Sequence, residues 1–552
     1  MIKKVTAICL FLMILMFSAM AQTKPSAITN NSSGVARPKL VVGLVVDQMR
    51  WDYLYRYSSM YRSKGFKRLL SQGYSFENSF IPYTPTYTAA GHASVYTGSV
   101  PAVNGIVGNN WFDRKTGTNV YCTDDSTVTT IGSSSRAGKM SPENLWASTI
   151  TDELRLSNNF QSKVIGIALK DRGAILPAGH AANAAYWYDD AVGKFITSSY
   201  YMKELPEWVN QFNNKDWPGT YMSKDWTTLF PIEKYILSTE DNKPYESSIS
   251  GETSPTFPHK LSAITKGKYG SFRTTPFANT FTFDFAKAAV ENEKLGAGAV
   301  TDFLAVSISS TDYIGHSFGP NSIEIEDTYY RLDNDIADFL QFLDNKLGKG
   351  NYLFFLTADH GVAHIPAFLN EHKMPGGTFD DNAILKEINS SLAIEFGMDK
   401  ILQNIQNYQF YINIKEVEKN GKDLELIKKS VIKALMAKPF IVNAFDITKL
   451  NETTLPQPQK NMMANGYNPV RSGDIMFTVK PGYFDGGTKG TTHGLWNPYD
   501  AHIPNLWFGW NIKPGKSNRE TYMTDIAPTV AALLKIQMPN GSVGKVLEEV
   551  VK

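Results

Sequence analysis

Four short apolar runs stand out along the chain. They cover residues 39–46 (KLVVGLVV), 164–169 (VIGIAL), 303–308 (FLAVSI) and 352–356 (YLFFL). Runs of this length without regular polar alternation are typical of strands that are buried on both faces of a parallel sheet. The stretch 323–347 lies between the last two runs and has the apolar and acidic pattern of an amphipathic helix. This alternation predicts an α/β fold, with a mostly parallel sheet sandwiched by helices.

The rest of the chain predicts one large domain with insertions. Residues 474–479 and 505–510 look like further strands, and residues 525–534 look like a closing helix. A length of 552 residues would allow two to four domains, but a single enlarged α/β domain over residues 38–552 fits equally well. Two less regular stretches, around 185–300 and 375–470, are rich in aromatic residues, Asn, Pro and Lys. We interpret them as insertions that form a cap beside the sheet.

The first 21 residues have the layout of a secretory signal peptide. Lys3 and Lys4 precede an apolar run over residues 5–17, and Ala19-Met20-Ala21 offers a small-x-small cleavage site after Ala21. The alternative is an uncleaved membrane anchor, but the run is shorter than the ~20 residues that span a bilayer. The polar segment 22–37 reads as a tether.

Cleavage would change the charge and cysteine content of the protein. Removing two lysines from 55 basic residues leaves 53, which balances the 53 acidic residues. A neutral protein has no overall field for nucleic acid or for an anionic membrane, so we expect neither as a partner. Cys122 would be the single remaining cysteine. Export without an internal disulfide favours a bacterial periplasmic location.

Polar residues that can carry chemistry follow each of the four predicted strands. They are Asp47, the run Lys170-Asp171-Arg172, the pair Asp312 and His316, and the pair Asp359 and His360. Each alone is weak evidence, because an Asp after a strand is often a helix cap or part of a turn. Four together are harder to attribute to chance, because ligands of open α/β sheets bind beyond the carboxyl ends of the strands.

The types of these residues indicate metal ions. Carboxylate oxygens and imidazole nitrogens without thiolates suit zinc in a catalytic site, although ligand type alone does not separate zinc from other divalent ions. Asp312 and His316 with a third nitrogen donor could hold one ion. Asp47, Asp359 and His360 could hold another. Two such ions would stabilise both the attacking and the leaving oxygen of a displacement. A further Ca²⁺ site among the acidic loops is not located by the sequence.

Thr88 is the candidate nucleophile. It lies in residues 84–98 (TPTYTAAGHASVYTG), where an extended stretch crowded with hydroxyl groups passes into a helix of small residues. A hydroxyl at a helix N-terminus faces free N–H groups and the positive end of the helix dipole. On sequence alone, a plain helix cap explains Thr88 better. A metal ion on its oxygen would reverse that balance by lowering the pKa of the hydroxyl.

The order of these motifs resembles the alkaline phosphatase superfamily from about residue 38 to the C-terminus. The matching segments are Asp47 after the first strand, PTYTAAGH with Thr88, GIVGNNWFD with Asn109, STDYIGHSFGP with Asp312 and His316, TADHG with Asp359 and His360, and GTTHG with His493. The threonine nucleophile, the asparagine and the Lys-x-Arg pair most resemble the PafA-type periplasmic phosphatases. Sulfatases share the fold but need a C/S-x-P-x-R context, which neither Thr88 nor Cys122 has.

The resemblance implies a ligand set and a mechanism. One zinc ion would be bound by Asp312, His316 and His493, and the other by Asp47, Asp359, His360 and Thr88. Thr88 would form a phospho-threonine intermediate, and Asn109, Lys170 and Arg172 would bind the phosphate. The remaining histidines are expected to be structural or to lie on the surface. Among them, His364 lies close to the Asp359-His360 motif, so a role as a further ligand stays open for it.

The pair Lys170 and Arg172 favours phosphate monoesters as the substrates. We expect a monomeric enzyme that acts on small molecules. We expect the two side chains to alternate along an extended strand end and so to face the same side. Two cations and an amide donor match the charge of a monoester, whereas a diester has one charge fewer and an extra organic group. Two alternatives remain, a nucleotide phosphodiesterase or pyrophosphatase of the same superfamily and a catalytically weak periplasmic phosphate-binding protein.

Overall fold

The computed structural model describes residues 36–552. Within that range, residues 38–552 form one compact unit. The predicted signal peptide (1–21) lies outside the described residues, and so does the predicted tether (22–37) apart from its last two residues. Among the described residues, no helix is both long enough and apolar enough to cross a membrane.

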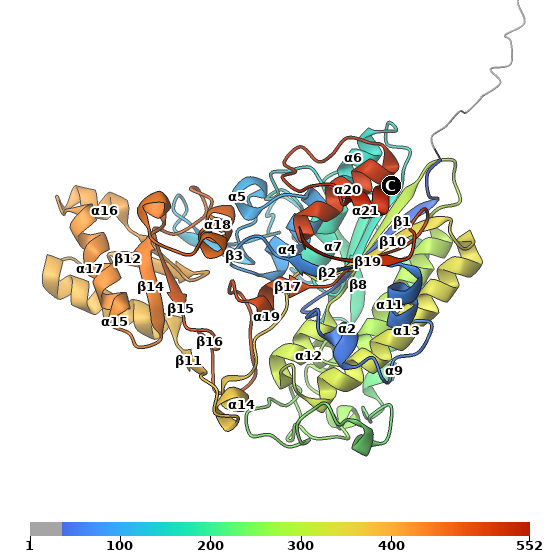
Figure 1. The fold of residues 1–552 in the computed structure, drawn as a ribbon, viewed down its shortest axis with the longest axis horizontal. Helices are drawn as coiled ribbons and strands as arrows, with labels where there is room; N and C mark the ends of the chain where they lie inside the picture. Colours follow the sequence, from blue (N-terminus) through green and yellow to red (C-terminus); the bar gives the residue numbers. More distant parts are fainter. Residues whose placement is uncertain (1–35) are drawn as a thin grey trace, which may run out of the picture. The chain divides into compact units, whose positions relative to one another are not determined.

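The centre of the unit is an eleven-stranded sheet whose middle strands are parallel (Figure 1). Strand β1 (Leu40–Val46) pairs in parallel with β10 (Tyr352–Thr357) on one side and with β9 (Asp302–Ile308) on the other. Strand β6 (Val164–Ala168) pairs in parallel with β9 and with β7 (Ala184–Asp189). The four predicted strands are therefore adjacent and parallel. Their residues are entirely buried, as the apolar runs predict.

Antiparallel strands complete both edges of this sheet. On the β10 side, the order is β18, β2 and β17, with β19 parallel to β2. On the β7 side, β8 and β5 follow. The bounds are β2 (Tyr74–Phe80), β5 (Thr130–Ile131), β8 (Lys194–Ser198), β17 (His502–Ile503), β18 (Asn505–Gly509) and β19 (Gly515–Tyr522).

Helices cover both faces of the sheet (Figure 1). Helices α4 (Thr88–Thr97), α7 (Asp171–Ala178) and α20 (Ile526–Leu534) lie on one side, and α11 (Phe277–Asn292) and α13 (Ile323–Leu347) lie on the other. Helix α13 has the predicted bounds, and its N-terminus is capped because the Ser322 side chain accepts a hydrogen bond from the amide of Ile325. Such capping satisfies one of the free amides of the first turn. The predicted α/β sandwich is confirmed.

Shorter elements connect these layers. The helices are α2 (Tyr53–Arg56), α3 (Phe66–Gln72), α5 (Pro101–Asn104), α6 (Ile150–Leu156), α8 (Glu207–Asn213), α9 (Trp217–Met222), α10 (Lys268–Phe272), α12 (Ser310–Phe318), α14 (Pro366–Glu371), α18 (Gln457–Gly466), α19 (Pro498–Ala501) and α21 (Glu548–Val551). Two small sheets are formed by β3 (Asn110–Asp113) with β4 (Thr118–Tyr121) and by β11 (Gly377–Phe379) with β16 (Tyr483–Asp485).

A separate four-stranded sheet is built mainly from residues 381–479 (Figure 1). Its order is β12 (Leu402–Gln406), β13 (Gln409–Ile412), β15 (Ile475–Val479) and β14 (Ile441–Asp446). Helices α15 (Asp381–Phe396), α16 (Ile414–Lys419) and α17 (Leu424–Met436) accompany it, and it has an apolar core of its own. The predicted strand 474–479 belongs here rather than to the main sheet.

The first expected insertion, 185–300, has different bounds in the structure. Its beginning supplies β7 and β8 to the main sheet, and its end supplies α11 to a helical layer. Only the middle, about 199–276, lies outside the sheet and its layers. Aromatic residues that suggested an insertion belong instead to the main core, where the ring of Phe195 stacks on those of Phe281 and Phe285.

Candidate active site

The carboxyl ends of the central parallel strands bring the predicted site residues together. Asp47 follows β1, Asp359 and His360 follow β10, and Lys170 follows β6. Asp312 lies in the first turn of α12, directly after β9. Because neighbouring parallel strands end at the same edge of a sheet, residues more than 300 positions apart in sequence come within contact distance.

Asp47, Asp359 and His360 form the first candidate metal-binding set. Their ligand atoms lie within 4.8 Å of one another, and all three side chains are buried. Nε2 of His360 lies 3.5 Å from Oδ1 of Asp47 and 3.4 Å from Oδ2 of Asp359. Both of these carboxylate oxygens are buried and have no hydrogen-bond partner. Since buried polar atoms are normally satisfied, two orphaned oxygens facing one imidazole nitrogen fit a bound cation.

Asp312, His316 and His493 form the second candidate set. Oδ1 of Asp312 lies 3.1 Å from Nε2 of His316 and 3.7 Å from Nε2 of His493. Asp312 and His316 are four residues apart on α12 and therefore share one helix face. His493 reaches the same oxygen from the segment between β16 and α19. The predicted third nitrogen donor thus comes from a distant part of the chain.

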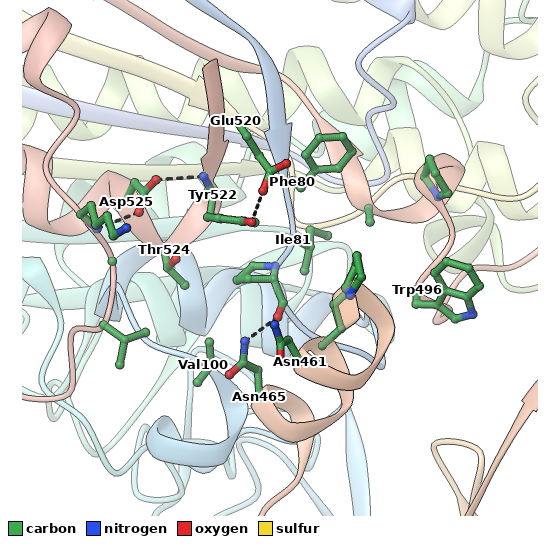
Figure 2. A pocket seen from close by; sticks show the side chains of 18 residues that line it. Phe80, Ile81, Val100, Asn461, Asn465, Trp496, Glu520, Tyr522, Thr524 and Asp525 are labelled. Atoms are coloured by element: carbon green, nitrogen blue, oxygen red, sulfur yellow. Dashed lines mark hydrogen bonds between the residues drawn. The ribbon is translucent and has the colours of Figure 1, made fainter. Parts of the chain in front are cut away.

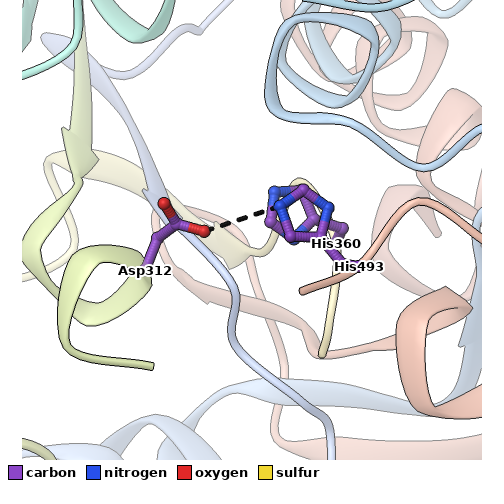
Figure 3. A group of neighbouring side chains, drawn as sticks. All are labelled: Asp312, His360 and His493. Atoms are coloured by element: carbon purple, nitrogen blue, oxygen red, sulfur yellow. Dashed lines mark ion pairs between the residues drawn. The ribbon is translucent and has the colours of Figure 1, made fainter. Parts of the chain in front are cut away.

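His360 lies between the two sets. Its ring stacks on that of His493 with a centroid distance of 3.4 Å, and it also lies near Asp312 (Figure 3). Its Nε2 can ligate only one ion, and that atom lies near two unpaired carboxylate oxygens of the first set. We therefore assign His360 to the set with Asp47 and Asp359.

In His316, His360 and His493, Nε2 is the ring nitrogen that has no backbone partner. In each, Nδ1 donates a hydrogen bond to a backbone carbonyl, which can only accept. The distances are 2.9 Å from His360 to Gly361, 2.7 Å from His316 to Thr491 and 2.7 Å from His493 to Thr86. A carbonyl on Nδ1 fixes the tautomer that leaves the Nε2 lone pair available, as in metal-binding histidines.

The charge balance of the site also fits divalent cations. Burial and the negative charges of Asp312 and Asp359 raise the pKa of Asp47 well above its usual range. Lys170 donates hydrogen bonds to Asp47, at 2.7 Å, and to Asp312. Burial disfavours the charged ammonium, but Asp312 and Asp47 outweigh it and raise the pKa of Lys170. One lysine still leaves three buried carboxylates short of positive charge, which divalent ions would supply.

Thr88 is the first residue of α4 and is buried. Its side chain does not cap the helix, because Tyr87 occupies the capping position. Instead, Oγ1 of Thr88 lies 3.2 Å from Nε2 of His360. Asn109 accepts a hydrogen bond from the amide of Ala89 at 2.9 Å, which leaves the Nδ2 group of Asn109 as a donor near the start of α4. Gly91 has no side chain where a Cβ would collide with the backbone of Asp359.

Lys170 and Arg172 reach the site in a different way from the one expected. Strand β6 ends at Ala168 and α7 begins at Asp171, so Lys170 occupies the position just before the helix and Arg172 lies in its first turn. The extended alternation expected from the sequence is therefore wrong, because the chain turns into a helix at this point. Nη1 of Arg172 donates to the hydroxyl of Tyr121 at 2.9 Å.

Two buried residues that contact the candidate ligands and Thr88 were not found by sequence reasoning. The side chain of Gln48 donates to Oδ1 of Asp312 at 2.7 Å, and its backbone amide donates to Oδ1 of Asp359 at 3.1 Å. His92 lies 2.8 Å from the carbonyl oxygen of Thr88 and 3.3 Å from Oδ2 of Asp359. The sequence could have indicated both residues, because Gln48 directly follows a predicted ligand and His92 lies one helical turn after the predicted nucleophile.

His364 lies outside both sets. Its ring nitrogens contact Arg50 at 3.1 Å and Asn321 at 2.6 Å. Burial and the positive charges of Arg50 and Arg56 lower the pKa of His364 to about 3. The side chain is therefore neutral and occupied by these neighbours, as expected for a structural histidine.

A cavity of about 540 Å³ lies apart from this chemistry (Figure 2). Apolar side chains such as Ile81, Met462 and Trp496 form most of its wall, and Glu520 and Asp525 add acidic groups. None of its lining residues is a candidate site residue. Size alone therefore does not locate the active site in this molecule.

Comparison with known proteins agrees with this geometry. The family described as type I phosphodiesterase/nucleotide pyrophosphatase matches residues 41–502. The alkaline phosphatase PhoV of Synechococcus elongatus is 52% identical over the full length of both chains. A Myroides odoratus protein named calcium-transporting ATPase is 51% identical over 99% of this chain and 98% of its own.

The alkaline phosphatase PafA of Elizabethkingia meningoseptica is 52% identical over 94% of this chain and 96% of its own. A crystal structure of wild-type PafA superimposes with a TM-score of 0.92, covering 94% of this chain and all of the other. The similarity thus extends over the main sheet and over the separate four-stranded sheet. The chain belongs to the type I phosphodiesterase/nucleotide pyrophosphatase family of the alkaline phosphatase superfamily, and it is an enzyme of the alkaline phosphatase type.

Proposed function

We propose that the protein hydrolyses small phosphate monoesters in the periplasm, with Thr88 as the nucleophile and two zinc ions as cofactors. The observation that carries the proposal is the position of the Thr88 hydroxyl. It is buried at the N-terminus of α4 and lies 3.2 Å from His360, inside a set of ligands with two unpaired carboxylate oxygens. A threonine in a merely structural role has no need of such surroundings.

The ligand sets described above define where the metal ions would bind. Asp47, Asp359 and His360 would hold one ion beside Thr88, and Asp312, His316 and His493 would hold the other. Bound there, zinc supplies positive charge that lowers the pKa of a hydroxyl group or water and stabilises charged oxygens. The backbone carbonyls on the histidines keep the imidazoles neutral and correctly oriented for this role.

The residues of the chain would then perform a displacement in two steps. Oγ1 of Thr88 attacks phosphorus, the bond to the alcohol oxygen breaks, and the alcohol leaves with a proton. Water then attacks the phospho-threonine, which releases inorganic phosphate and restores the hydroxyl. Lys170, Arg172 and Nδ2 of Asn109 would bind the phosphate oxygens, and the free amides at the start of α4 add further positive potential.

Three phosphate-binding donors favour a monoester over a diester, since a monoester presents one more negative charge and one more unsubstituted oxygen. A solved variant of PafA carries substitutions of a threonine, an asparagine, a lysine and an arginine. In that variant, the threonine and asparagine are 21 residues apart, and the lysine and arginine are two apart. Thr88 and Asn109, and Lys170 and Arg172, have the same spacings here.

Export and oligomeric state complete the proposal. The basic start, apolar run and Ala19-Met20-Ala21 support cleavage after Ala21 and transport to the periplasm. A neutral mature chain suits a monomeric enzyme that acts on small molecules. N-terminal sequencing of the mature protein from the periplasmic fraction checks the cleavage site.

The test compares 4-nitrophenyl phosphate with its methyl diester, using wild type, Thr88→Ala and Thr97→Ala. Thr97 lies on the same helix, and its hydroxyl bonds to the backbone carbonyl of Ala93 and the backbone amide of Ser99, so it serves as a matched control. We expect Thr88→Ala to lower kcat/KM for the monoester by about a thousandfold or more, because the covalent step is lost. Thr97→Ala should remain within a few-fold of wild type.

Full activity of Thr88→Ala would overturn the assignment of the nucleophile. A wild-type preference for the diester would favour the nucleotide phosphodiesterase alternative, which the family description also names.

A further inference from the structure

A small polar pocket adjoins the proposed active site. It has a volume of about 270 Å³, and its wall is formed by Tyr87, Asn109, Asn110, Asp381, Asn382, Ile405, Gln406, Asn407 and Asp485. The first three residues belong to the part of the chain that carries Thr88, and the other six belong to α15, β12, β16 and the turn after β12. Asn407 joins the two sides by donating to the carbonyl of Asn110 at 2.9 Å.

The position of this pocket suits the alcohol part of a substrate. Asn109 lines the pocket and also accepts a hydrogen bond from the amide of Ala89, the residue after Thr88. Tyr87 precedes Thr88, and its ring packs edge-on against His493 at a centroid distance of 5.6 Å. A phosphate held beside Thr88 and Asn109 therefore has the pocket next to it. The volume fits a small group, because pockets for drug-sized ligands are usually larger.

The charge of the pocket is one-sided. Two of its nine lining residues are acidic, none is basic, and five are neutral amides. Oδ1 of Asp381 is buried without a hydrogen-bond partner. Asp485 accepts a hydrogen bond from the amide of Asp381 at 3.0 Å, so the two carboxyl groups lie near each other. Burial and the charge of Asp485 raise the pKa of Asp381 to about 8.

We infer that the pocket binds the leaving group and favours monoesters of small alcohols that carry a positively charged amine. The buried carboxylate oxygen of Asp381 would receive the ammonium group, Asp485 would add negative charge, and the amide side chains would accept its remaining hydrogen bonds. A cation between the two carboxylates also removes their mutual repulsion. This inference rests on the proposed function, because it needs the phosphate to be bound beside Thr88.

The experiment measures kcat/KM for O-phosphoethanolamine and for propyl phosphate, which are similar in size and differ in the terminal ammonium and methyl groups. The ratio of the two values is compared between enzymes, so the difference in intrinsic reactivity cancels. We expect the double variant Asp381→Asn/Asp485→Asn to lower this ratio on the order of fivefold, the effect of one moderately exposed ion pair. The control Asp399→Asn removes an exposed carboxylate outside the pocket and should keep the wild-type ratio.

A second variant adds charge instead of removing it. Gln406→Glu places a third carboxylate in the wall of the pocket and should raise the ratio, so a folding defect of the double variant does not leave the inference untested. An unchanged ratio in both variants, with propyl phosphate still hydrolysed, would overturn the leaving-group site and leave the phosphatase assignment intact. Failure of wild type to hydrolyse either ester would instead contradict the proposed function.

Discussion

At the residue scale, the candidate site depends on which atom of each side chain is left without a protein partner. His316, His360 and His493 each use Nδ1 on a backbone carbonyl, and each keeps Nε2 for the site. Asp47 and Asp359 each keep one buried oxygen unpaired. His92 shows the contrast, because both of its nitrogens contact protein groups and it is left to position Thr88. Residue type alone does not separate these cases.

Tyr121 is a positioning residue for Arg172. Its hydroxyl accepts from Nη1 of Arg172 at 2.9 Å and donates to Oδ1 of Asp171 at 2.7 Å. We predict that Tyr121→Phe lowers kcat/KM for a phosphate monoester about tenfold, because the guanidinium loses the group that holds it in place. In an Arg172→Ala background, the same substitution should have little further effect. Equal losses in both backgrounds would show that Tyr121 does not act through Arg172.

At the scale of elements, the ends of strands and the starts of helices decide where charge gathers. Strands β10, β1, β9 and β6 are adjacent and parallel, so their carboxyl ends share one edge. The N-terminus of α4 carries Thr88 to this edge, and the N-terminus of α7 carries Lys170 and Arg172. Both helices point the positive ends of their dipoles toward a region where a phosphate would bind.

His259 connects two segments of the chain through buried charges. It lies in the segment before α10, and its ring nitrogens lie 3.0 Å from Glu252 and 3.3 Å from Glu324, at the start of α13. Burial disfavours its charge, but Glu252 and Glu324 outweigh burial and raise the pKa of His259 to about 9. Asp241 and Glu246 face the same group of charges.

A raised pKa makes the contribution of His259 to stability dependent on pH. The contribution is complete below about pH 6.5, where the unfolded chain is also protonated, and it is lost as pH rises toward 9. We predict that the difference in unfolding free energy between wild type and His259→Gln falls by up to about 3 kcal/mol between pH 6 and pH 9.5. Denaturant unfolding across that range measures it. The exposed His372→Gln should show no such change, and a flat difference for His259→Gln would contradict the prediction.

At the scale of the whole molecule, the candidate site and the pocket beside it take residues from two parts of the fold with separate cores. Thr88 and the candidate metal ligands other than His493 come from the main sheet and the helices that cover it. The part that contains the four-stranded sheet supplies Asp381, Gln406 and Asn407 to the pocket beside that site. The substrate's phosphate and its alcohol would therefore be recognised by different parts of the fold.

Metal removal should affect stability as well as activity. Asp47, Asp312 and Asp359 are buried carboxylates that repel one another, and Lys170 donates to two of them, so an ion that binds only the folded state stabilises it. We predict that a zinc chelator abolishes monoester hydrolysis and lowers Tm by several degrees. Zn²⁺ should restore both, whereas Mg²⁺, which prefers oxygen ligands, should not.

Asp47→Asn provides the matched variant for this measurement. Because it removes one of the repelling charges, the drop in Tm on chelation should be smaller than in wild type. An unchanged Tm and activity after verified removal of the metal would contradict the role of the two ligand sets.

The local pattern of the chain was enough to predict the central strands and α13 and to indicate most of the candidate ligands, whereas the resemblance of the motifs to a known family added His493 and the role of Thr88. These features depend on near neighbours in sequence, since burial sets the apolar runs and helical spacing pairs Asp312 with His316. The motif order supported the family for the same reason, because each motif is a short local segment.

Tertiary structure decided how those segments meet. The crossovers between strands set the order of the sheet, and this order places His493 opposite Asp312, Gln48 against two ligands and Lys170 between two carboxylates. The turn into α7 placed Arg172 on a helix, where the sequence had suggested an extended strand. Asp381 and Asp485 meet beside Asn109 only because a separate sheet packs there. Contacts across such distances are set by packing of the whole chain, so no local pattern records them.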